Sequence, residues 1–183
     1  MMQAVMWGLL GVMVGLAALV GRSRAHPVRP ATRAETYGHL TVALPAGWVV
    51  DKSSLPSRTS QFPAQVLTAQ EPRGGPTGSR VLTVTQEAPT EPTTAEEYLA
   101  AKADVKLKSL STAVVGGRRW LWVKSDPDEE SGRRPAFAIY GCTVTRTGEV
   151  VTVQLEGPGD VGPEDEALFW HVADRIQFHD GQP

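Results

Sequence analysis

Two glycine-containing turns constrain the fold of this chain more strongly than any other feature. Each turn separates two runs of residues that favour β-strands. The turns are Gly116-Gly117, between residues 112–115 and 118–124, and Thr147-Gly148, between residues 135–146 and 149–156. Glycine adopts the positive φ angles of tight hairpin turns at little steric cost, so both turns predict β-hairpins. We therefore expect an antiparallel sheet built around these hairpins.

The strands that carry Trp120 and Phe137 have apolar side chains on both faces. In the first of them, Trp120 and Trp122 alternate with Leu121 and Val123. Because successive side chains of a strand point to opposite faces, both faces of these strands need cover from other elements. The pattern favours helices on either side of the sheet.

Two helices are predicted to supply this cover. Thr94 and Glu97 have the spacing of a capping box, which predicts a helix that runs from Thr94 to about Leu110. Pro163 and the acidic residues after it are typical of a helix start, and they predict a second helix that ends at about Asp174. Further strands are predicted at residues 40–44, 65–70 and 80–86. The sequence thus predicts an α+β fold, an α/β sandwich in which helices lie on both sides of an antiparallel sheet.

A hydrophobic segment precedes this domain. Ala4–Val20 contains 17 residues and no charged side chain, which predicts an N-terminal hydrophobic helix that contacts a membrane. Small residues at Ser23 and Ala25 fit signal-peptide cleavage after Ala25, although the chain start lacks the basic residues of a signal peptide. If the segment is retained, the arginines after it favour a cytoplasm-facing domain. We therefore expect either a cleaved signal peptide or a transmembrane helix.

Composition divides the chain into four parts. These are a signal peptide or membrane anchor at residues 1–25, a basic, proline-containing linker at 26–36, a folded domain at 37–179 and a tail at 180–183. The whole chain has a net charge of −2, but from Glu35 onward 14 basic and 20 acidic residues give a net charge of −6. An acidic domain does not favour nucleic-acid binding. The single cysteine, Cys142, excludes an intrachain disulfide and is expected to be a small buried apolar residue.

The sequence contains one literal match to a dinucleotide-binding motif. Gly157, Gly159 and Gly162 have the GxGxxG spacing, but Asp160 and the acidic residues at 164–166 would repel a pyrophosphate. We therefore expect a turn into the last helix. The acidic loop 126–132 lacks the glycine and glutamate positions of a calcium loop, so a solvated loop is expected there. No set of residues predicts a catalytic site, a metal site or a bound cofactor.

Three aromatic residues form the candidate binding site. Trp120, Trp122 and Tyr140 lie on the strands that are apolar on both faces. If a helix covers them incompletely, they would line a groove for a small apolar ligand or a peptide. If a helix covers them fully, they are part of the hydrophobic core. The groove would make the protein a carrier or sensor of such a ligand.

Several segments together resemble PsbP-like domains, the fold of the photosystem II extrinsic protein and of a Ran-binding relative. These segments are Leu40-x-Val42-x-Leu44-Pro45-x-Gly47-Trp48, the helix start Thr94-x-Glu96-Glu97-Tyr98, the long central hairpins, the helix with Leu168-Phe169 and the short Arg175–Phe178 segment. The resemblance covers roughly residues 37–179 and is one of pattern and order.

This resemblance implies an antiparallel sheet between helices, usually without enzymatic activity. Such domains often belong to exported or membrane-tethered bacterial proteins that act as binding or assembly accessories. On this basis we expect a non-catalytic, membrane-tethered or secreted accessory protein with a protein partner. The resemblance favours the extracytoplasmic side for the domain, with a cytoplasm-facing anchored domain as the alternative.

Overall fold

The computed structural model describes residues 32–55, 64–72, 79–89, 94–103, 109–125 and 136–179, all within the compact unit Ala31–Pro183. The strands are β1 (Thr32–Tyr37), β2 (Leu40–Pro45), β3 (Val49–Leu55), β4 (Ala64–Gln70), β5 (Val81–Glu87), β6 (Ser111–Val115), β7 (Arg118–Ser125), β8 (Ala136–Val144), β9 (Val150–Pro158) and β10 (Gln177–Phe178). The helices are α2 (Ala95–Ala103) and α3 (Pro163–Asp174). Both predicted hairpins and the predicted bounds of the second helix are confirmed.

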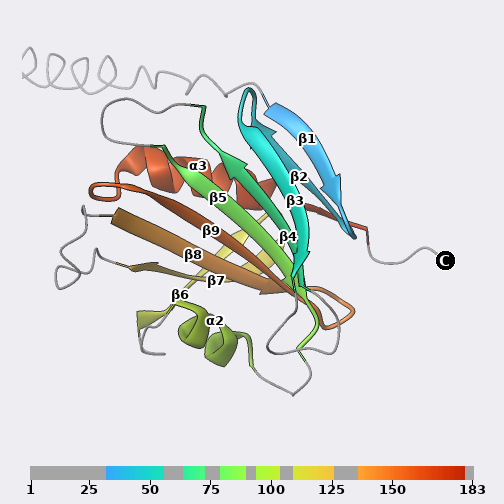
Figure 1. Ribbon diagram of the computed structural model, residues 1–183. Coiled ribbons are helices and arrows are strands. Elements are labelled where there is room, and N and C mark those ends of the chain that lie inside the picture. The colour runs from blue at the N-terminus through green and yellow to red at the C-terminus, as the bar shows by residue number, and fades with distance from the viewer. Residues whose placement is uncertain are drawn as a thin grey trace, which may run out of the picture. The chain divides into compact units, whose positions relative to one another are not determined.

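The strands form two antiparallel sheets. A seven-stranded sheet has the order β3-β4-β5-β9-β8-β7-β6, and a three-stranded sheet has the order β1-β2-β10 (Figure 1). The large sheet consists of two runs of sequential neighbours, β3-β4-β5 and β6-β7-β8-β9. One long-range pairing joins these runs, from Val81 opposite Glu156 to Glu87 opposite Val150.

The main hydrophobic core lies on one face of the large sheet. Buried side chains of β4, β5, β7, β8 and β9 pack there against β2 and α3. Phe169 of α3 approaches the sheet at Gly141, where a Cβ atom would lie 2.6 Å from the Phe169 Cζ. Only glycine permits this close approach of the aromatic ring to β8. The core is therefore shared by both sheets and one helix.

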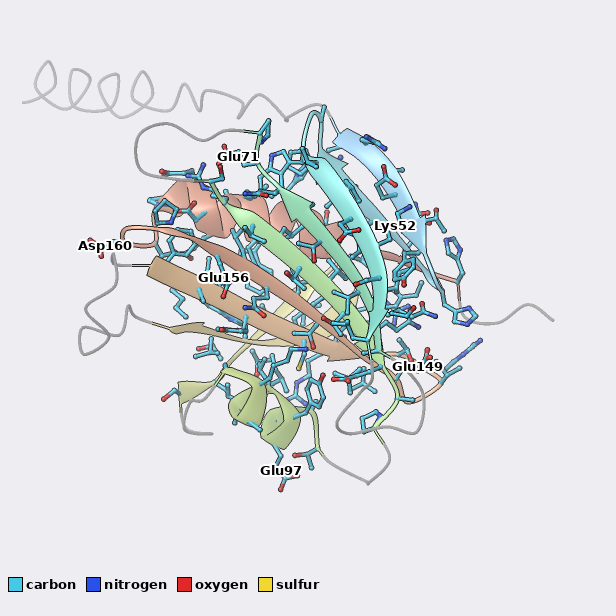
Figure 2. All side chains as sticks on the ribbon, in the orientation of Figure 1. Lys52, Glu71, Glu97, Glu149, Glu156 and Asp160 are labelled. Carbon is cyan, nitrogen blue, oxygen red and sulfur yellow. The ribbon has the colours of Figure 1, made fainter. Side chains whose placement is uncertain are left out.

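A second, smaller core lies on the opposite face, beneath α2. Tyr98 and Leu99 of α2 pack there against Leu121, Cys142 and Val150 of the sheet. The predicted capping box starts this helix, because the Thr94 amide donates to Glu97 Oε2 at 3.0 Å. In return, the Glu97 amide donates to Thr94 Oγ1 at 3.2 Å. Glu97 itself points away from the sheet (Figure 2). Residues 104–108, the rest of the predicted helix, lie outside the described residues.

The predicted fold class, an α+β sandwich with helices on both sides of the sheet, is wrong. The protein is mostly β, since 57% of the described residues lie in strands and 19% in helices. The three-stranded sheet shares with α3 the cover of one face of the large sheet. On the other face, the described residues supply one element of cover, the nine-residue α2, which packs at β7 and β8. Apolar patterning reveals that a strand face is covered, but it does not reveal whether a helix or a second sheet covers it.

The N-terminal predictions need two corrections. No helix within the described ranges is long and apolar enough to cross a membrane, so a transmembrane helix is not part of the described fold. The expected hydrophobic helix at Ala4–Val20 and the cleavage site after Ala25 lie outside the described residues, as does the acidic loop 126–132. The predicted linker at 26–36 overlaps β1, because this strand begins at Thr32 and pairs with β2.

Candidate functional site

The structure does not bring the three predicted aromatic residues to one site. Trp120 is fully buried in the main core. Trp122 is half-buried on the same face and makes an edge contact with Trp170 of α3, with 5.4 Å between ring centroids. Tyr140 lies directly opposite Val123, and it packs against the smaller core on the α2 face. Because the sheet separates Tyr140 from the two tryptophans, these residues do not line a common groove.

Burial of Tyr140 has a chemical consequence. Its partial burial, and secondarily the negative charge of Glu156, raise the pKa of the phenol above its usual value. The hydroxyl accepts a hydrogen bond from Gln154 Nε2 at 3.5 Å. Tyr140 therefore stays protonated at neutral pH and has a packing role in the described structure.

The glycine motif begins in the last residues of β9, and its part after Pro158 forms the predicted turn into α3. The Gly162 amide donates to the buried carboxylate of Asp165 at 2.8 Å. Arg80 Nε donates to the same carboxylate at 2.5 Å, and Arg80 also pairs with Glu71 and Glu164. The Asp165 carboxylate therefore binds the Gly162 amide that a phosphate would need. The motif is a structural start for α3.

A cleft opens where β7 and β8 separate. The pairing of these strands starts at Leu121 opposite Cys142, and before this pair the Thr143 hydroxyl donates to the Arg119 carbonyl at 2.8 Å. The cleft has a volume of about 310 Å³, and the first residues of α2 border it. Its lining residues are Ala95, Glu96, Arg118, Arg119, Leu121, Cys142, Thr143 and Val144.

The two arginines of the cleft differ in their availability. Arg118 stacks its guanidinium group on the ring of Phe178, with 3.8 Å between the guanidinium carbon and the ring centroid. Arg119 is 67% exposed and pairs with Glu96 at 3.5 Å, a surface contact of little stabilising value. Arg119 can therefore exchange Glu96 for a carboxylate of a bound molecule.

Cys142 is not an activated nucleophile. It is fully buried, and its thiol donates weakly to the Ala95 carbonyl, with 3.6 Å between Sγ and the oxygen. Burial raises the pKa of this thiol to about 12, so the thiol is protonated at neutral pH. The cleft thus combines an apolar floor with charged walls and contains no thiolate.

Beside the cleft, β6 forms one edge of the large sheet. Gly116 and Gly117 both have positive φ, and Val115 is paired with Arg118 across this two-residue turn. The turn makes Val115 and Arg118 a hydrogen-bonded pair, and hydrogen-bonded pairs alternate with non-bonded ones along the hairpin. The backbone N–H and C=O groups of Thr112 and Val114 therefore point away from β7.

No described strand pairs with this outer side of β6. The strand has the sequence STAVV, without a charged residue, and Val114 is 75% exposed. Thr112 and Val114 lie opposite Leu121 and Arg119, so their side chains are on the same face as the cleft. The sequence predicts the hairpin but not this edge, because strand order is set by pairings that the hairpin pattern does not contain. An uncharged strand next to a Gly-Gly turn is the one local signal.

Among the described residues, no three His, Cys, Asp or Glu side chains are close enough to hold a metal ion. The sequence matches no family model and no curated protein. The structure is similar to that of PA94 from Pseudomonas aeruginosa, a protein of unknown function suggested to be a regulator. The two share 13% identity with a TM-score of 0.47, over 83% of this chain and 98% of the other. This distant likeness carries no inference about function, and the resemblance to PsbP-like domains stays a prediction.

Proposed function

We propose that this protein is a non-catalytic binding protein that takes up an extended polypeptide segment along β6. The single observation that carries the proposal is the open edge of this uncharged strand, with the N–H and C=O groups of Thr112 and Val114 directed outward. A peptide that adds to a sheet edge gains backbone hydrogen bonds, and neighbouring pockets select its side chains.

The surroundings of β6 support this mode of binding. Side chains of an added strand would alternate between the two faces of the sheet. Those on the cleft side would lie against the exposed Val114, with Arg119 in the next strand. Such a segment would bury an apolar side chain on Val114 and could place a carboxylate near the Arg119 guanidinium group.

The chemistry of the cleft supports a role without catalysis. Its cysteine thiol is protonated, because burial raises the pKa of Cys142 to about 12. The cleft volume of about 310 Å³ is at the lower end of the range for small-molecule sites, and it suits one side chain of a bound segment.

The proposal is tested with ten-residue peptides selected from a phage-displayed random library on the full chain. We expect bound peptides to slow hydrogen exchange of the Thr112 and Val114 amides at least tenfold. Val114→Pro removes the outward N–H and leaves the bonds to β7 in place, because proline is tolerated at such an edge position. This variant should lose binding at least tenfold, whereas the matched control Val114→Ala, which keeps the N–H, should lose less.

Three results would contradict the proposal. The first is that selected peptides bind without protecting the β6 amides. The second is that Val114→Pro binds as tightly as Val114→Ala. The third is a concentration-dependent dimer in sedimentation experiments whose pairing occupies β6, since the edge would then serve self-association.

A further inference from the structure

A small cavity lies between the two sheets, far in sequence from the proposed peptide site. Its volume is about 10 Å³. Its lining residues are Tyr37, Leu40 and Val42 of the small sheet and Gln65, Leu67, Val84 and Gln86 of the large sheet. The walls are apolar apart from the Tyr37 side chain and the two glutamines.

Two of the lining residues, Gln65 and Gln86, carry buried hydrogen-bond acceptors. Gln65 and Gln86 lie directly opposite each other on β4 and β5, so their side chains share one face of the sheet. The Oε1 atoms of both are buried, and no described group donates a hydrogen bond to either. Buried amide oxygens in folded proteins almost always accept a hydrogen bond, so both atoms need a donor.

The orientation of Gln86 is set by a second contact. Its Nε2 donates to Glu149 Oε2 at 2.9 Å, and the residue is only 4% exposed. Figure 2 shows Glu149 at the end of the sheet where β8 turns into β9. Because the amide nitrogen faces Glu149, the oxygen faces away from it. Turning this amide over would place two oxygens against each other, so Gln86 Oε1 stays an acceptor.

We infer that one buried water molecule occupies this cavity and donates its two hydrogen atoms to Oε1 of Gln65 and Oε1 of Gln86. Three features of the site select water. The volume is close to the minimum of about 10–15 Å³ that one water molecule needs. The site presents acceptors, which a molecule with two donor hydrogens satisfies together. A metal ion would need several more oxygen ligands than the two glutamines supply.

The water would connect β4 and β5 beneath the β1–β2 hairpin. Gln65 also lies against the turn of that hairpin, where a Cβ at Gly38 would lie 1.3 Å from Gln65 Oε1. The bridge therefore lies where the small sheet meets the large one. This inference does not depend on the proposed function.

A crystal structure of the full chain at about 1.5 Å resolution tests the site directly. We expect one density peak within hydrogen-bond distance of both oxygens. A map without that peak would overturn the inference. So would a map in which the Gln65 amide nitrogen donates directly to Gln86 Oε1.

A mutant cycle in urea unfolding tests the bridge in solution. Gln65→Leu and Gln86→Leu each leave the other oxygen without its full set of donors, so each should raise the unfolding equilibrium constant roughly tenfold. In the double variant no orphan acceptor is left, and its unfolding constant should be below that of either single variant. Glu149→Ala is the control for the Gln86–Glu149 bond, because it removes that bond and Glu149 does not line the cavity. Effects of the two single substitutions that simply multiply in the double variant would overturn the bridge.

Discussion

The two edge strands of the seven-stranded sheet, β3 and β6, differ in how their outer sides are covered. At β3, several side-chain contacts join the edge to β1. The Tyr37 hydroxyl donates to the Ser53 carbonyl, and Lys52 Nζ donates to the Thr36 carbonyl at 3.0 Å. Figure 2 shows Lys52 between these strands. At β6, no described strand pairs with the outward N–H and C=O groups, and Val114 is 75% exposed.

The residues of the two edge strands also differ in charge. Asp51 and Lys52 put charges on β3, and Lys52 pairs with the buried Glu35 at 2.9 Å. Charged side chains are a common protection of edge strands against pairing with other chains. β6 has no charged residue. One edge of the sheet is therefore closed by its neighbours, whereas the described residues leave the other edge open. Five predictions test this difference, in order of decreasing effect.

The largest effect is expected at the tryptophan that supports the open edge. Trp120 is fully buried and lies opposite Ala113 of β6. Trp120→Ala should lower the free energy of unfolding by about 3–5 kcal/mol, because it removes a large core side chain. Urea denaturation measures this change. A loss below about 1 kcal/mol, the size of an average substitution, would contradict the packing described for β7.

The next effect concerns alkaline stability at the same end of the sheet. The pKa of Cys142 is about 12 in the folded protein, compared with 9.0 for the free group. The unfolded chain therefore loses this proton first as the pH rises. Stability from the buried thiol is complete below pH 9 and falls toward pH 12, by up to about 1.4 kcal/mol per pH unit.

Cys142→Ala separates this effect from other alkaline titrations. The variant lacks the thiol, so its free energy of unfolding should fall less steeply above pH 9 than that of the natural chain. Parallel alkaline curves for the two proteins would show that the thiol is not protected by folding. Slow reaction of Cys142 with a disulfide reagent at pH 8, until urea is added, is the matching chemical readout.

Alanine substitutions at two glycines compare the β1–β2 hairpin, which lies next to the closed edge, with the β6–β7 hairpin of the open edge. Gly38 has a φ of +59°, and a Cβ there would collide with the Gln65 side-chain amide. Gly117 has a φ of +73°, and a Cβ there would meet no atom within 4 Å. Each alanine substitution should cost about 1–3 kcal/mol from the backbone conformation. Gly38→Ala should cost more, because Gln65 must also move, and equal losses would contradict that contact.

Acid titration probes the closed edge. The hydrogen bond from Lys52, assisted by the charges of Lys52 and Arg33, holds the pKa of Glu35 below its usual value despite desolvation. This stabilisation is complete above the unfolded pKa and is lost as the pH falls through the folded pKa. Glu35→Gln should lower stability by about 1 kcal/mol at pH 7 and by much less at pH 2.5. A difference that is unchanged by pH would contradict the ion pair.

The smallest effect is expected at the open edge itself. Val114→Lys introduces the kind of charge that β3 already has, at a position that is 75% exposed. It should change the free energy of unfolding by less than about 0.5 kcal/mol. Lys52→Met, the opposite change at the closed edge, should cost more, because it removes the contacts with Glu35 and Thr36. If Val114→Lys costs more than Lys52→Met, β6 is not an open edge.

Local chemistry made some of this structure predictable. Gly116-Gly117 and the Thr94–Glu97 pair gave correct hairpin and helix starts, because the turn and the cap depend on residues only a few positions apart. Pro163 and the acidic residues after it predict the last helix with its correct bounds. The acidic residues around Gly162 correctly indicated a turn, since Asp165 binds its amide.

Features that depend on distant pairings were not predictable in this way. β1 (TRAETY) lacks apolar alternation and exists through its pairing with β2, so its sequence predicts a linker. β3 was missed for the same reason, since its charged middle resembles a loop. The aromatic site failed because Trp122 and Tyr140 lie on opposite faces of neighbouring strands. The register between β7 and β8 determines this, and neither strand's own sequence contains it.

The pairing of β5 with β9 has a consequence for synthesis on the ribosome. β5 ends at Glu87, but its first partner residue, Val150, is 150 − 87 = 63 residues later. At roughly 5–20 residues per second, this partner emerges about 3–13 s after β5. During that interval β5 is an unpaired edge strand of the newly made β3-β4-β5 meander. Slower elongation between these residues would lengthen the time in which nascent chains can pair with one another.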